Sequence, residues 1–261
     1  MPSNGGDQQK GVLAILAAAL SPEGYAQATL VTTADGVLKA SVGMDLDFGA
    51  DHYWIRFVGT PAATTPWTLQ YGGHHLAINV TLAGSKMTMA PTLWGSQPAF
   101  YDKDGQKFEP LSGETNKAYA LMTAFDGTQQ KAATLTTPLT EIVLVAGKDG
   151  QTLPAAGIEA STFKNAQKKV LLELEQEWLR PLNPESAAAR LAAAESELDR
   201  SSFRWYGTPT VGQPIYYRVV TPTFVIEFAH QQGMGANSDG VNHIHSIYRE
   251  IGNDYGAKLT A

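Results

Sequence analysis

The chain alternates two helical stretches with two strand-rich stretches, and this order constrains its fold more than any other feature. Residues 8–42 and 161–199 carry apolar residues three and four positions apart, which is the spacing of helices with one buried face. Residues 52–101 and 203–250 hold short runs of β-branched and aromatic residues separated by turn-forming residues. Because strands and helices do not alternate one by one, we predict an α+β fold with a mixed or antiparallel sheet flanked by helices.

Local signals set the expected element boundaries. Ser21 and Pro22 restart a helix with a capping hydroxyl and a proline in its first turn, while Pro181 and Pro184 divide 161–199 into a helical hairpin. Residues 83–86 are typical of a hairpin turn. Loops are expected at 102–117 and 147–160. Strands are expected at 52–60, 67–71, 75–83, 86–94, 203–206, 215–220, 224–228 and 242–249.

The 261 residues, of which 43% are hydrophobic, suffice to bury a full core. We expect residues 1–261 to form a single α+β domain. A short similarity between 54–61 and 216–222, both of which end in Thr-Pro, suggests a weak internal duplication.

Composition excludes several classes of function. The net charge of −6 comes from 25 acidic and 19 basic residues that form no basic stripe, so we expect no nucleic-acid partner. The longest apolar run, Val12 to Leu20, is far shorter than the roughly 20 residues that cross a bilayer, so no transmembrane segment is expected. Residues 1–10 lack the order of a signal peptide, although a trimmed leader would leave the same sequence, and the compartment stays open. The absence of cysteine rules out disulfides and thiolate ligands.

Two histidine clusters point to a metal site. His243 and His245 lie two apart on an expected strand, so their side chains share one face at a separation of about 7 Å. His75 falls on the polar face of another expected strand, whereas His74 falls on its apolar face and is expected to be packed. We therefore predict His75, His243 and His245 as ligands of Fe(II), Mn(II), Cu(II) or Zn(II), with their imidazoles within about 5 Å of one another.

Three charged residues near the second cluster are candidates for catalysis. Glu227 lies inside an apolar strand, where burial would raise its pKa and suit it to proton transfer. Glu250 follows His245 by five residues and is considered with Glu227 as a base or a fourth ligand. Arg249 shares the expected face of the histidines and either binds an anionic group or pairs with Asp254.

Four sequence strings together resemble a known family. They are Gly-His-His-Leu-Ala-Ile-Asn at 73–79, Thr-Phe-Val-Ile-Glu-Phe at 223–228, Asn-His-Ile-His-Ser-Ile-Tyr-Arg-Glu at 242–250 and Asn-Asp-Tyr-Gly at 253–256. In this order they are similar to the domain-of-unknown-function family numbered thirty-five hundred, in which Tyr248 and Glu250 replace a typical Trp and Asp. The resemblance implies that nearly the whole chain belongs to this family. It does not imply any particular activity.

Other catalytic motifs are missing from the sequence. It contains no Gly-x-Ser-x-Gly elbow, no Gly-x-x-x-x-Gly-Lys phosphate loop, no His-Glu-x-x-His helix and no Gly-x-Gly-x-x-Gly. We therefore favour a metal-dependent enzyme that acts on a small organic substrate. The alternative is a non-catalytic ligand-binding or structural module in which the histidines complete a buried polar network. The sequence does not indicate the oligomeric state.

Overall fold

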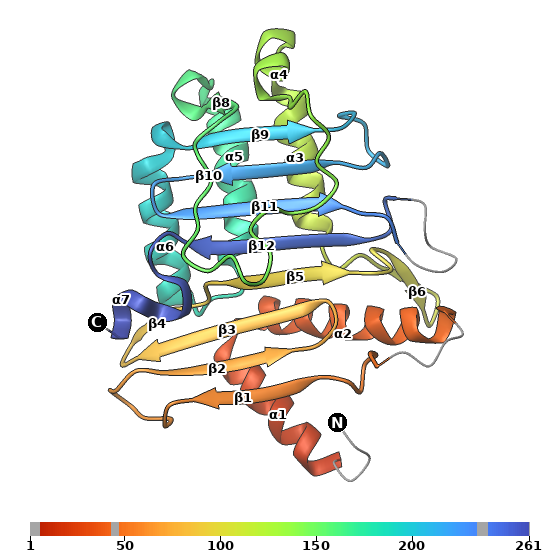
Figure 1. Cartoon of the computed structure of the whole chain (residues 1–261), viewed down its shortest axis with the longest axis vertical. Coiled ribbons are helices and arrows are strands. Elements are labelled where there is room, and N and C mark those ends of the chain that lie inside the picture. Colours follow the sequence, from red (N-terminus) through yellow and green to blue (C-terminus); the bar gives the residue numbers. More distant parts are fainter. Residues whose placement is uncertain (1–5, 43–46, 234–239, 261) are drawn as a thin grey trace.

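The computed structural model describes residues 6–42, 47–233 and 240–260, and its dominant feature is one continuous ten-stranded sheet (Figure 1). The strands follow the order β1-β2-β3-β5-β12-β11-β10-β9-β8, and β4 pairs with β3 beside this path. The named strands pair antiparallel throughout, so the predicted α+β fold is confirmed. The strands are β1 Trp54–Val58, β2 Trp67–Gly72, β3 Leu76–Ala83, β4 Lys86–Thr88, β5 Thr92–Ser96, β8 Ile158–Glu159, β9 Ser202–Tyr206, β10 Tyr216–Val220, β11 Phe224–His230 and β12 Ile244–Glu250.

The sheet consists of two similar halves that meet between β5 and β12. In each half two long helices precede four strands: α1 and α2 come before β1, β2, β3 and β5, and α5 and α6 come before β9 to β12. The counterpart of β1 is therefore β9, rather than β10 as the sequence comparison suggested. The sequence supports this pairing, because Arg56-Phe-Val-Gly-Thr-Pro61 and Arg204-Trp-Tyr-Gly-Thr-Pro209 match at four of six positions.

Helices cover one face of the sheet (Figure 1). The covering helices are α1 Gly6–Ala19, α2 Pro22–Val42, α3 Ser112–Ala124, α5 Asn165–Leu179 and α6 Pro184–Glu197, while α4 Gly127–Ala133 and the short α7 Ala257–Thr260 lie at the edges of the sheet. As expected, α6 begins with Pro184, and the Asn183 side chain caps it by accepting the Ser186 amide. The largest fully buried side chains of the main core include Trp205, Tyr217, Phe203, Phe228 and Leu16.

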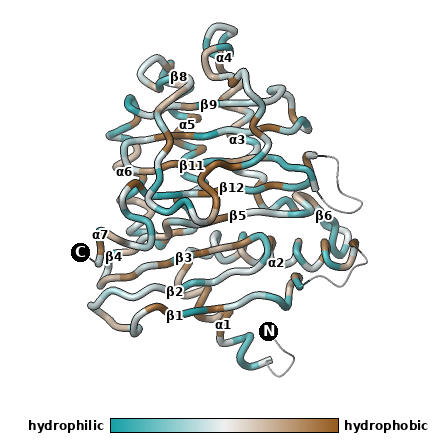
Figure 2. The backbone as a smooth tube through the Cα atoms, in the orientation of Figure 1, coloured by the Kyte–Doolittle hydropathy of each residue, from teal (hydrophilic) through white to brown (hydrophobic). Residues whose placement is uncertain are grey.

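A segment without helix or strand, residues 134–157, crosses the other face in front of β9 to β12; we call it the strap (Figure 1). Its Ile142 and Leu144 are buried against Tyr216, Val225 and Ile247 of the sheet. Figure 2 shows the apolar stretch of the strap where it lies on these strands. The sheet is thus packed on both faces in its β9–β12 half, which explains why β10 and β11 are buried along their whole length.

The strand expected at 86–94 and the loop expected at 102–117 differ from the structure. The strand expected at 86–94 is divided into β4 and β5 by Pro91, which has no amide hydrogen for a strand ladder. The loop expected at 102–117 contains a hairpin of β6 Tyr101–Lys103 and β7 Gln106–Phe108 and the first turns of α3. Helix α3 follows Leu111, which makes no capping side-chain bond, so the sequence carries no start signal there. None of the described helices is long and apolar enough to cross a membrane.

Candidate metal centre

The three predicted ligands converge where the two halves of the sheet meet. His245 is the second residue of β12 and His243 directly precedes this strand, and the backbone of His245 is paired with Gly95 of β5. The Gly95 amide also donates a hydrogen bond of 2.7 Å to the carbonyl of His75, just before β3. Residues 168 positions apart in the chain are therefore brought together by two neighbouring strand pairs.

A tight turn delivers His75 to this place. The Gly73 amide donates to the Leu76 carbonyl at 2.9 Å, which closes the turn between β2 and β3. A Cβ atom on Gly72 would lie 2.8 Å from the Leu76 oxygen, and one on Gly73 would lie 2.7 Å from the Tyr53 ring. Both glycines are thus required by close packing, and the turn they allow places His75 beside β5.

The Nε2 atoms of the three imidazoles face one another. The His75 and His243 Nε2 atoms are 3.2 Å apart, and those of His243 and His245 are 3.1 Å apart. One ligand atom from each residue lies within 4.8 Å of the others. The expected convergence within about 5 Å is confirmed. His75 is 1% exposed, whereas the His245 side chain is 27% exposed, so the cluster reaches from the interior to the surface.

The opposite nitrogen of His75 is held by a buried carboxylate. His75 Nδ1 lies 2.5 Å from Asp35 Oδ1, and the other Asp35 oxygen accepts the Tyr53 hydroxyl at 2.6 Å. Asp35 is fully buried in α2. A carboxylate is an acceptor only, so the proton of a neutral His75 ring belongs on Nδ1, and Nε2 presents a lone pair to the cluster.

His243 is oriented in the same way. Its Nδ1 lies 3.1 Å from the backbone carbonyl of Gln232, which also accepts only. Burial lowers the pKa of His243 to about 4, and the neighbouring imidazoles of His245 and His75 act in the same direction. A neutral His243 therefore also presents a lone pair, and two acceptors face each other at 3.2 Å.

This arrangement fits a transition-metal ion. Metal–nitrogen bonds of about 2.0–2.1 Å place two imidazole nitrogens about 3.0 Å apart at a right angle and about 3.4 Å apart at a tetrahedral angle. The two measured separations of 3.1 and 3.2 Å lie inside that interval. Three imidazole donors are typical of Zn, Cu or Fe sites, and the buried Asp35 carboxylate, which holds the His75 ring, would supply compensating charge to a bound cation.

Gly95 makes the space in which two of the rings lie. A Cβ atom at this position would be 3.1 Å from His75 Cδ2, 3.2 Å from His245 Cδ2 and 2.9 Å from the Ile244 carbonyl oxygen. A larger residue on β5 would push the two imidazoles apart. Gly95 is therefore part of the centre although it offers no ligand.

His74 does not join the cluster, and the expectation that it packs into the core is wrong. It is exposed, and its ring stacks on Phe48 with ring centres 4.5 Å apart. The alternation of a strand does not apply to it, because β3 begins only at Leu76 and His74 belongs to the preceding turn.

Glu227 and Arg249 are buried and bind the strap. Glu227 accepts the amides of Val143 and Leu144, the shortest of these bonds being 2.7 Å, and the Tyr216 hydroxyl at 2.5 Å. Arg249 donates to the carbonyls of Leu144 and Val145, each at 3.1 Å. Arg249 also forms the expected ion pair with Asp254, at 2.6 Å, and a second with Asp149.

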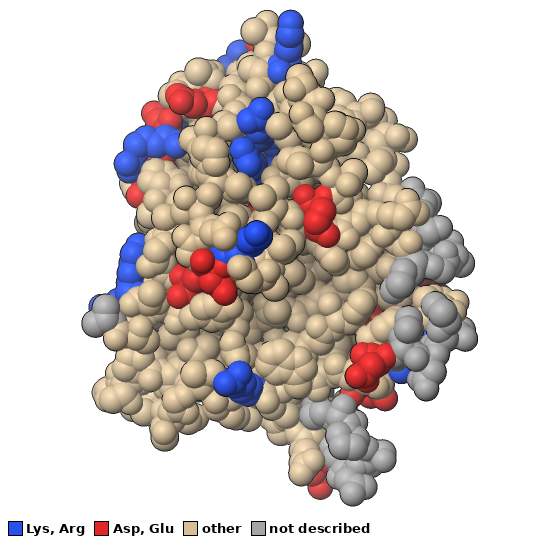
Figure 3. Space-filling view, viewed as in Figure 1, with Lys and Arg blue, Asp and Glu red and all other residues tan. Residues whose placement is uncertain are grey.

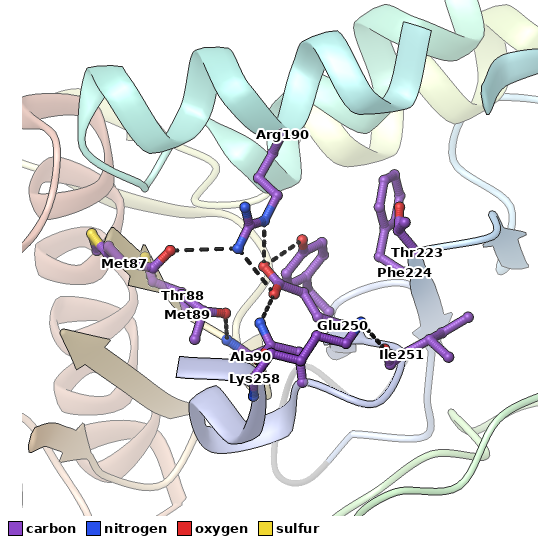
Figure 4. A network of polar contacts seen from close by, with 12 residues as sticks. Met87, Thr88, Met89, Ala90, Arg190, Thr223, Phe224, Glu250, Ile251 and Lys258 are labelled. Atoms are coloured by element: carbon purple, nitrogen blue, oxygen red, sulfur yellow. Dashed lines mark hydrogen bonds and ion pairs between the residues drawn. The ribbon is translucent and has the colours of Figure 1, made fainter. Parts of the chain in front are cut away.

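Glu250 lies in a separate network on the opposite face of β12 (Figure 4). Arg190 of α6 donates to it at 2.7 and 3.1 Å, and the Tyr248 hydroxyl donates at 3.3 Å. The expectation of Glu250 as a fourth ligand is wrong, because an offset of five residues from His245 directs its side chain away from the histidines. Catalytic roles for Glu227, Arg249 and Glu250 remain untested predictions, and their contacts are those of structural residues.

Sequence reasoning missed the residues that support the histidines. Asp35 and Tyr53 lie in segments before His75, and Gln232 lies in the connection between β11 and β12; no spacing in the sequence connects them with His75 or His243. Glu141 of the strap was missed as well; its Oε2 lies 3.4 Å from His245 Nδ1. Figure 3 shows acidic and basic side chains interspersed on the face that the strap covers. A cluster of like charges therefore does not mark the site either.

A family model described as "Protein of unknown function (DUF3500)" matches residues 3–257. This confirms the resemblance carried by the four sequence strings. Comparison with curated proteins and with solved structures found no match.

Proposed function

Because this chain belongs to the DUF3500 family, whose description names no activity, we propose a function from the site itself: a metal-dependent enzyme that acts on a small organic substrate. His75, His243 and His245 would hold a divalent transition-metal ion through their Nε2 atoms. The observation that carries the proposal is the 3.2 Å separation of the His75 and His243 Nε2 atoms while both Nδ1 atoms face acceptors, from which we infer that two lone pairs point at each other. Two lone pairs at this distance repel each other, and a cation bound between the two nitrogens would remove the repulsion.

The ligand set supports catalysis rather than a purely structural role for the ion. Structural sites are closed by four protein ligands, whereas catalytic sites keep a position open. Within the described residues, the cluster contains three ligands, and His243 and His245 are partly exposed. An ion bound there would supply Lewis acidity for polarising a substrate oxygen or activating water. Asp35 would hold the His75 ring in place throughout.

The test is the metal content and the melting temperature of protein purified without a histidine tag, for the wild type and for His245→Ala. We expect close to one transition-metal ion per chain in the wild type after reconstitution. His245→Ala should lose the metal and keep its fold, because the ring is partly exposed and packs little. His74→Ala is the matched control: it removes a neighbouring imidazole outside the cluster and should keep the metal.

The alternative function, a non-catalytic module with a buried polar network, is favoured by the Asp35–Tyr53 hydrogen bond, which is fully enclosed. It predicts a different result for the same variant. If the histidines are structural, His245→Ala leaves partners unsatisfied and lowers stability by about 1–3 kcal/mol without any change in metal content. That outcome, or persistent absence of metal in the wild type, contradicts the enzyme proposal.

A further inference from the structure

Each imidazole of the centre has a second nitrogen, and only two of the three have a clear acceptor there. Asp35 serves His75 and the Gln232 carbonyl serves His243. At His245, the Nδ1 atom lies 2.8 Å from the Gln231 Nε2 atom and 3.4 Å from Glu141 Oε2. An amide nitrogen is a donor, so it suits a His245 ring whose proton is on Nε2.

A metal ion on Nε2 of His245 reverses this requirement. The neutral ring must then carry its proton on Nδ1, where the Gln231 NH2 group is the wrong partner. The Glu141 carboxylate is within reach and accepts only. The Ile142 amide donates to Glu141 Oε1 at 2.7 Å, which leaves Glu141 Oε2 on the side of His245.

Two buried side chains of the sheet hold the part of the strap next to Glu141. Glu227 holds the amides of residues 143 and 144, and Arg249 holds the carbonyls of residues 144 and 145. Both side chains belong to the strap-covered face, which also carries His245, because the register pairs Glu227 with Ile247 and Val225 with Arg249. The strap is thus clamped two to four residues from Glu141, although Glu141 itself is 48% exposed.

We propose that the strap supplies the third outer acceptor of the metal centre: Glu141 receives the Nδ1 proton of metal-bound His245, and Glu227 and Arg249 are positioning residues that act through it. This inference rests on the proposed metal site. It assigns a role to Glu227 and Arg249, which are buried under the strap. The charge of a divalent cation would be balanced by two carboxylates, those of Asp35 and Glu141.

The test is the zinc affinity of untagged protein, measured by competition with a chromogenic chelator, for Glu141→Gln, Glu227→Gln and the double variant. Loss of an outer acceptor typically weakens metal binding 10–100-fold. We expect Glu141→Gln to lose about tenfold in affinity with an unchanged melting temperature. Glu159→Gln, an exposed glutamate in β8, is the matched control and should bind zinc as the wild type does.

The double variant separates positioning from general stability. If Glu227 acts through Glu141, the double variant should bind zinc about as tightly as Glu141→Gln alone. If the two residues act independently, the fold losses in zinc affinity of the two single variants should multiply. Nitrogen NMR of the zinc-loaded protein should also show His245 protonated at Nδ1, with a proton shift that changes in Glu141→Gln. Should Glu227→Gln not fold, Arg249→Lys replaces it in the cycle, because it keeps the charge while losing carbonyl contacts.

The outcomes separate this inference from the proposed function. A wild-type protein that binds no zinc overturns the metal site and the inference with it. A wild-type protein that binds zinc, with Glu141→Gln equal to Glu159→Gln, overturns only the inference. If zinc affinity instead falls in Gln231→Leu and not in Glu141→Gln, the Gln231 amide turns its oxygen to His245 and the strap has no part in the centre.

Discussion

Glu175 of α5 should make the stability of this protein depend on pH in a way that one substitution removes. The side chain is 0% exposed, and neither carboxyl oxygen has a hydrogen-bond partner among the described residues. Burial raises the pKa of this carboxyl from 4.5 to about 8. The folded protein therefore holds a proton on Glu175 at neutral pH, whereas the unfolded chain releases it.

The sign and size of the effect follow from this difference. Below the pKa of Glu175 in the unfolded chain, the side chain is protonated in both the folded and the unfolded state. In that range it does not lower the free energy of unfolding. As the pH rises from about 4.5 towards 8, the folded state binds one proton more than the unfolded state, so the free energy of unfolding falls by about 1.4 kcal/mol per pH unit. Between pH 5 and pH 7 the loss amounts to about 3 kcal/mol. Glu175→Gln, which does not titrate, should remove this contribution.

Urea unfolding of the wild type and of Glu175→Gln at pH 5, 6, 7 and 8 measures the difference directly. The stability of the variant relative to the wild type should rise steadily over this range, whatever its absolute value at pH 5. Glu173→Gln is the control on the same helix, because Glu173 is partly exposed and pairs with Lys169. Parallel stability curves for the wild type and Glu175→Gln would refute the reasoning.

Three further predictions concern the centre and the sheet. Gly95→Ala should weaken zinc binding at least tenfold, because its Cβ would lie 3.1–3.2 Å from His75 and His245. The control is Gly127→Ala, because nothing lies within 4 Å of a Cβ at that position. Equal zinc affinities of the two variants would contradict the role given to Gly95. Asp35→Asn keeps the size of the side chain but removes the charge behind His75, so zinc affinity measured by competition should fall 10–100-fold; an unchanged affinity would show that Asp35 does not support the site. Limited proteolysis should yield no stable fragment ending near residue 150, because β5 and β12 join the two halves in one sheet; recovery of such a folded fragment would contradict the predicted single domain.

The sequence was sufficient for the fold class and for the three histidines, because both depend on local patterns. The spacing of apolar residues in α5 and the pair of histidines at positions 243 and 245 are visible within a few positions. Glu250 was misassigned because the strand was expected to end at residue 249, whereas β12 extends to Glu250, and within a strand the offset of five residues from His245 places the two side chains on opposite faces. His74 was misplaced because the alternation was extended into a turn.

The strap and the outer acceptors depend on contacts between distant segments. Residues 134–157 have no periodic pattern, so nothing in them indicates that they cover a sheet. In the sequence, nothing distinguishes Asp35 from other polar residues of a helix. Its role becomes visible only in the folded chain, where α2 packs beside the turn that carries His75. The duplication was assigned to the wrong strand because Thr-Pro occurs after both β9 and β10, and only the strand order identifies β9 as the counterpart of β1.

X-ray absorption spectroscopy of the zinc-loaded, untagged protein tests the central claim most directly. The account predicts three imidazole nitrogens at about 2.0–2.1 Å from the zinc, together with a solvent oxygen in the open position. The imidazole count should fall from three to two in His75→Ala and stay at three in His74→Ala. Fewer than three imidazoles in the wild type, or a spectrum that His75→Ala leaves unchanged, would contradict the three-histidine metal centre.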